Sequence, residues 1–162
     1  MEMLWHQKLE NTYELKLELF RIYIKKLSSK QAIRWLEIVL LMVFIYSLLL
    51  VFAGSIAGEL FSFFGFGPSE LISTQKFQEY LLLPYMVLGA VMAGWTLLMI
   101  QIVRGPLREG SDWARTFITR SLILWFFLDT GMSLVLGYPN HALFNIPFAI
   151  VLGIPLYSLS KK

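Results

Sequence analysis

Cysteine is absent from the 162 residues of the chain. This absence excludes disulfides, thiolate metal sites, iron–sulfur clusters and a cysteine nucleophile. Histidine occurs at two positions, His6 and His141, and the topology predicted below places them on opposite sides of a membrane. Intramembrane bis-histidine haem ligation and a multi-histidine metal site within one chain are therefore excluded, and we expect no metal and no cofactor.

Charge is also scarce. Charged residues make up 15% of the chain and hydrophobic residues 57%, against about 25% and about 45–50% in soluble domains. The apolar residues are concentrated in runs, which indicates a membrane protein rather than a large soluble core. We predict a single all-α membrane domain over residues 1–162, an integral membrane four-helix bundle with spans at about 33–58, 80–103, 113–137 and 141–160.

Residues 1–29 precede the first span. Their apolar residues recur at helical spacing, with charged residues opposite, which predicts an amphipathic helix on the membrane surface or on the cytoplasmic end of the bundle. A docking helix for a partner protein is the alternative. Tyr13–Phe20 also alternates like a strand, but an isolated strand would leave its edges unpaired. Ser28 and Gln31 have capping-box spacing, so a new helix is predicted to begin there.

The connections differ in character. Residues 59–79 form the longest one, with an aromatic, glycine-rich stretch at Leu60–Gly67, for which an interfacial segment and a re-entrant lid are alternatives. Residues 104–112 form a compact turn, in which Gly105 and Pro106 are predicted to end the second span and Ser111 or Asp112 to cap the third.

Two spans carry residues that affect packing. Gly89, Ala90, Ala93 and Gly94 place small residues four apart in the second span, which favours close approach of a neighbouring helix. The fourth span contains two prolines besides a glycine and an asparagine, so we expect it to be kinked or locally unwound.

The basic residues determine the predicted orientation. With four spans, every Lys and Arg except Lys76 lies on the side of the 104–112 turn and both termini. The positive-inside rule makes that side cytoplasmic, N-in and C-in, in a multi-pass protein of the inner (plasma) membrane. The arginines flanking the turn are expected to contact lipid headgroups; they are Arg104, Arg108, Arg115 and Arg120.

The third span contains one carboxylate, Asp129. An Asp at the centre of a membrane helix costs about 2.5–3.5 kcal/mol and is usually partnered by protein. Counting from Arg120 places Asp129 about 13 Å from the cytoplasmic boundary, near the midplane. The residues predicted to form a polar cluster at a similar depth are Tyr46, Ser47, Trp95, Thr96, Asp129, Ser133 and Asn145. His141 is expected in a solvent-facing turn.

Three functions are compatible with this cluster. It fastens helices together in a structural protein or an accessory subunit of a membrane complex, which is the favoured hypothesis. Alternatively it carries protons or a small solute in a transporter, or binds a lipid or another amphipathic ligand. No histidine is expected at the depth of Ser47 or Ser133, so we predict no catalytic residue, and an enzymatic role would need a bound cofactor or a partner subunit.

The stretch Gly89–Tyr157 contains GAVMAGW, VRGPLREGSDWA, SLILWFFLDTGMS, NHALFN and IPLY. It resembles the latter part of small, mostly uncharacterised four-helix proteins of the bacterial inner membrane. The resemblance implies a bacterial source but no activity. The expected partner is the lipid bilayer, with a larger membrane complex or a homo-oligomer as open alternatives, and no nucleic acid is expected.

Overall fold

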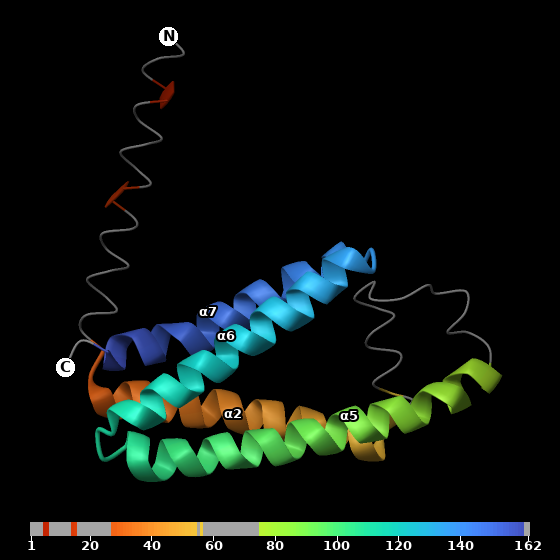
Figure 1. The fold of residues 1–162 in the computed structure, drawn as a ribbon, viewed down its shortest axis with the longest axis horizontal. Coiled ribbons are helices and arrows are strands. Elements are labelled where there is room, and N and C mark those ends of the chain that lie inside the picture. Colours follow the sequence, from red (N-terminus) through yellow and green to blue (C-terminus); the bar gives the residue numbers. More distant parts are fainter. Residues whose placement is uncertain (1–4, 7–13, 16–26, 55, 57–74, 161–162) are drawn as a thin grey trace.

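The computed structural model describes the chain except residues 1–4, 7–13, 16–26, 55, 57–74 and 161–162 (Figure 1). The described part contains no strand and has four long helices, each long and apolar enough to cross a membrane. They are α2 (Ser29–Phe52), α5 (Gln75–Ile102), α6 (Asp112–Val135) and α7 (Pro139–Leu159), with a π-helical turn η1 (Val103–Leu107) after α5. For the described residues, the predicted all-α fold with four helices long and apolar enough to span a membrane is confirmed. The predicted amphipathic helix 1–29 and the connection 59–79 lie almost wholly outside the described residues.

α2 begins with the capping box predicted at Ser28 and Gln31. The Gln31 main-chain N–H donates to Ser28 Oγ at 3.2 Å, and the Ser28 N–H donates to Gln31 Oε1 at 2.9 Å. These two bonds satisfy main-chain donors that the first turn of a helix leaves unpaired. α2 ends at Phe52, earlier than the predicted boundary at 58, because Ala53 leaves the helical conformation with φ −136°.

The second span continues beyond its predicted end. Gly105 and Pro106 lie inside η1, and the Ser111 N–H donates to the Pro106 carbonyl five residues earlier at 2.9 Å. Pro106 has no N–H of its own, and a widened π turn accommodates that missing donor. Ser111 occupies the N-cap position of α6 as predicted, although its hydroxyl makes no cap hydrogen bond. α7 is one continuous α-helix despite Pro147 and Pro155. The local unwinding considered for the fourth span therefore does not occur.

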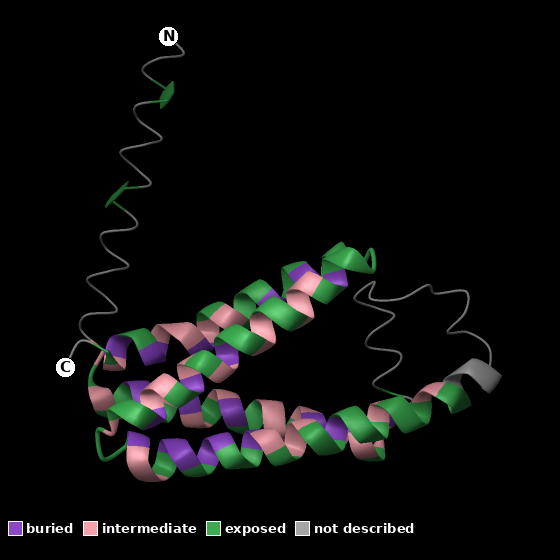
Figure 2. Ribbon diagram, in the orientation of Figure 1, coloured by how far each residue is buried: buried purple, intermediate pink, exposed green. Residues whose placement is uncertain are grey.

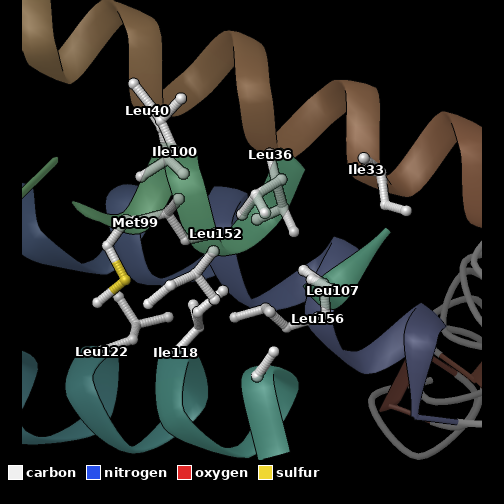
Figure 3. Packing of buried hydrophobic residues seen from close by; sticks show 13 residues of the cluster. Ile33, Leu36, Leu40, Met99, Ile100, Leu107, Ile118, Leu122, Leu152 and Leu156 are labelled. Atoms are coloured by element: carbon white, nitrogen blue, oxygen red, sulfur yellow. The ribbon is translucent and has the colours of Figure 1, made fainter. Parts of the chain in front are cut away.

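The helices pack as two antiparallel hairpins. α2 runs along α5, α6 runs along α7, and α7 and η1 also contact α2. We call the end that carries the start of α2 and the end of α7 the basal end, and the opposite end the distal end. At the basal end all four helices contribute to one buried cluster (Figure 3). The fully or nearly fully buried members from the four helices and η1 include Leu36, Leu40, Met99, Val103, Ile118, Leu122, Leu152 and Leu156.

This shared core covers only part of the length of the helices. It contains no residue of α6 beyond Leu122, apart from the partly buried Trp125, and no residue of α7 before Leu152. Toward the distal end the α6–α7 hairpin diverges from the α2–α5 hairpin, and exposed residues predominate at its tip (Figures 1 and 2). Each hairpin therefore depends on its own internal packing there.

The α2–α5 hairpin closes tightly at Gly89. A Cβ atom at this position would lie 2.6 Å from the Ser47 carbonyl oxygen and 2.8 Å from Leu50 Cβ. Part of the predicted small-residue pattern therefore packs against a neighbouring span of the same chain. At Gly94 an added Cβ would meet nothing within 4 Å, so that glycine does not serve the contact.

We predict that Gly89→Ala destabilises the protein, whereas Gly94→Ala does not. The new methyl group at Gly89 would push against main-chain atoms of α2, and overpacking of this kind costs roughly 1–3 kcal/mol. At Gly94 the same change adds only helix propensity, about 1 kcal/mol in favour of the fold. Thermal unfolding in detergent micelles measures both, and equal midpoints for the two variants would contradict the close approach.

Candidate functional site

A tight turn positions the polar groups of the α6–α7 hairpin. α6 ends in a Schellman motif, in which the Tyr138 N–H donates to the Ser133 carbonyl at 2.8 Å and the Gly137 N–H to the Leu134 carbonyl at 3.1 Å. Gly137 takes φ +81°, the left-handed conformation that the motif requires. Pro139 then starts α7 at once. The last two turns of α6 therefore lie beside the first two turns of α7.

Asp129 lies at the centre of the resulting cluster. Asn145 Nδ2 donates to Asp129 Oδ2 at 2.8 Å and to Thr130 Oγ1 at 3.1 Å, and His141 Nε2 lies 3.2 Å from the same Asp129 oxygen. Ser133 contacts the main chain of Asp129 and not its carboxylate: the Ser133 hydroxyl donates to the Asp129 carbonyl at 2.6 Å. We call the contacts of Asp129 with His141, Asn145 and Thr130 the α6–α7 clasp.

The clasp combines one well-buried group with two partly exposed ones. Asn145 is 3% exposed, whereas the side chains of Asp129 and His141 are 37% and 27% exposed. A carboxylate that accepts hydrogen bonds from protein groups costs less in a membrane than an isolated one.

Asp129 lies in the distal half of α6. It precedes the last residue of α6 by six positions, about 9 Å along a helix that is about 36 Å long.

The other predicted members of the polar cluster lie elsewhere. Ser47 and Thr96 donate to carbonyls of their own helices, Phe44 and Met92, each at 2.6 Å. Trp95 Nε1 donates to Ser121 Oγ at 3.4 Å. Tyr46 of α2 lies near Tyr85 of α5. Of the predicted cluster, the structure brings together Asp129, Ser133 and Asn145.

Two members of the clasp were missing from the predicted cluster, His141 and Thr130. A signal for His141 was present in the sequence, because residues four apart share one face of a helix and His141 precedes Asn145 by four. Among the described side chains, no buried nitrogen or oxygen atom lacks a hydrogen-bond partner. The buried amide of Asn145 is thus satisfied within the hairpin by Asp129 and Thr130, as expected of a structural contact.

The four arginines predicted to contact lipid lie around the 104–112 turn, at the basal end of the molecule. Arg104 lies 3.8 Å from Glu37 of α2, and Arg115 pairs with Asp112 at 3.0 Å. Arg108 and Arg120 are exposed. Their positions in η1, the turn and the first turns of α6 place all four toward the basal end.

No group of three or more His, Cys, Asp or Glu side chains with metal-site spacing occurs in the part of the chain that the structure describes. The four helices, each long and apolar enough to span a membrane, indicate a multi-pass membrane protein. Comparison of the chain with known protein families, curated proteins and solved structures found no match. A more particular role has to be argued from the clasp and from the arrangement of the helices.

We predict energetic coupling between Asp129 and Asn145. In a double-mutant cycle with Asp129→Ala and Asn145→Ala, the loss from the two changes together should be smaller than the sum of the single losses, by about 0.6 and at most about 1.7 kcal/mol. Reversible unfolding in micelles provides the four free energies. Ser47→Ala is the matched control, because Ser47 bonds within α2, and it should not couple to Asp129→Ala. Coupling of zero for the Asp129–Asn145 pair would remove the clasp as a stabilising contact.

Proposed function

We propose that this protein is a non-enzymatic accessory subunit of a membrane complex, in which the α6–α7 clasp holds one hairpin in shape and meets a partner. The observation that carries the proposal is the partial exposure of Asp129 and His141 within helices long and apolar enough to span the membrane. Ionisable side chains inside a membrane almost always face protein or a water-filled cavity, because hydrocarbon contact is costly. A partner helix against the clasp would provide that protein environment.

The divergence of the hairpins supports the same role. Beyond Leu122 and before Leu152, α6 and α7 contribute to the shared core only through the partly buried Trp125. In a bilayer no hydrophobic force drives these distal halves together, since lipid tails are as apolar as leucine. The distal faces are thus available to a transmembrane helix of another subunit at little cost.

For orientation, we propose that the basal end is cytoplasmic and that the protein lies in a bacterial inner membrane. Lys30, Arg34, Arg104 and Arg108 belong to the basal end, where α2 begins and α5 ends. This distribution agrees with the positive-inside rule and gives both termini a cytoplasmic location.

Site-specific photocrosslinking tests the subunit role. A photoreactive residue at Leu128 or Met132, exposed and near Asp129 in α6, should crosslink to one other polypeptide in native membranes. The same residue at Ile38, exposed in the basal half of α2, serves as the control and should give lipid adducts only. The variant Asp129→Leu removes a polar contact with the partner that is worth about 1 kcal/mol. Its affinity for the partner, and with it the crosslink yield, should therefore fall about fivefold. Self-crosslinks or lipid adducts alone at both distal positions would contradict an accessory subunit.

Proton-coupled transport is the second candidate, and the contact between Asp129 and His141 favours it. The carboxylate and the imidazole lie 3.2 Å apart and are both partly exposed. Chains of Asp, Glu and His side chains form the proton relays of membrane pumps and transporters.

Proteoliposomes with an imposed pH gradient test this candidate. If the protein is a transporter, Asp129→Asn should abolish proton flux, because the amide cannot carry the proton, while leaving the unfolding midpoint close to that of the wild type. Asp112→Asn removes an exposed carboxylate outside the clasp and should leave any flux unchanged. Absence of flux above that of empty liposomes in the wild-type protein would exclude proton transport by the isolated chain.

A further inference from the structure

A groove runs between α6 and α7 on the basal half of this hairpin. Its volume is about 420 Å³, within the range of about 300–1,000 Å³ typical of small-ligand sites. Asp129, His141 and Asn145 are not among its lining residues. The groove is therefore a feature separate from the clasp.

The two ends of the groove differ in chemistry. Toward the basal end it is lined by polar groups, Arg115, Thr119 and Ser160, and further along by apolar ones such as Phe126. Gly153 contributes to the hollow, because a Cβ atom at this position would meet nothing within 4 Å. A charged end and an apolar channel match an amphipathic molecule.

The length of the groove fits one leaflet of a bilayer. Its α6 wall extends from Arg115 to Phe127, a separation of twelve residue steps or about 18 Å of helix. Half of a hydrocarbon core that is about 30 Å thick is about 15 Å. One lipid acyl chain would thus lie along the groove with its headgroup at the basal end.

Arg115 supplies charge complementarity to a phosphate. Its Nη2 donates to Asp112 Oδ1 at 3.0 Å, and its side chain is 27% exposed while that of Asp112 is 90% exposed. A guanidinium has five N–H donors arranged for bidentate binding of phosphate. The pair with Asp112 therefore orients Arg115 without using its full donor capacity.

We propose that this groove binds one anionic phospholipid, with the phosphate on Arg115 and an acyl chain passing over Gly153 beside Phe126. The site differs from general headgroup contact, because it combines one arginine with a hollow of defined length. It also does not depend on the accessory role proposed above.

Native mass spectrometry of the purified protein in detergent, titrated with phosphatidylglycerol or phosphatidylcholine, tests the site. Wild-type protein should bind one phosphatidylglycerol preferentially. Arg115→Gln should lower phosphatidylglycerol affinity roughly tenfold, as expected for a lost charge-assisted hydrogen bond, and remove the preference over phosphatidylcholine. Gly153→Leu should prevent binding of both lipids, because its side chain fills the groove.

Three matched variants separate lipid binding from structural effects. Asp112→Asn breaks the ion pair but keeps Arg115, so phosphatidylglycerol should still bind. Arg120→Gln changes an exposed arginine of α6 that does not line the groove. Gly131→Leu changes a glycine of α6 that has open space around it, like Gly153, but also lies outside the groove. Both variants should leave lipid binding unchanged. Equal affinity of wild type for the two lipids, or full binding by Gly153→Leu, would overturn the proposal. So would displacement of phosphatidylglycerol by millimolar inorganic phosphate, which would assign the site to the free anion.

Discussion

A carboxylate placed within a membrane-spanning helix requires partners, and Asp129 finds them in the next helix along the chain. Asn145 and His141 both lie against one oxygen of Asp129. The short Schellman turn makes this possible, because it places the end of α6 directly beside the start of α7. The distal half of the hairpin is thus held by polar contacts, where the apolar core shared by all four helices no longer reaches.

Packing changes character along the length of the molecule. At the basal end leucine, isoleucine and methionine side chains from four helices interdigitate (Figure 3). At the distal end the α2–α5 hairpin relies on the approach of its backbones at Gly89, and the α6–α7 hairpin relies on the clasp. Small-residue contact and interhelical hydrogen bonding are two of the means by which helices associate in lipid. This protein uses one of them in each hairpin.

These differences have consequences for function. The hairpins diverge toward the distal end (Figure 1), and Asp129 and His141 are partly exposed in that part of the molecule. The accessory-subunit and transport proposals both follow from that exposure and differ in whether protein or water meets the pair. On the basal half of the same hairpin, Arg115 and the hollow at Gly153 offer a lipid a separate position.

The sequence by itself determined the four helices, the capping box at Ser28 and the involvement of Asn145 with Asp129. Each of these is local or nearly local, since the bilayer sets the length and apolarity of a span and the turn at Gly137 limits which residues meet. Only the tertiary structure decided that Tyr46, Ser47, Trp95 and Thr96 lie apart from Asp129 and that His141 joins it. Equal depth along four helices does not determine their rotation or their divergence. Those depend on packing between side chains distant in the sequence. A buried hydroxyl such as that of Thr96 can also bond to a carbonyl of its own helix instead of to a neighbouring helix.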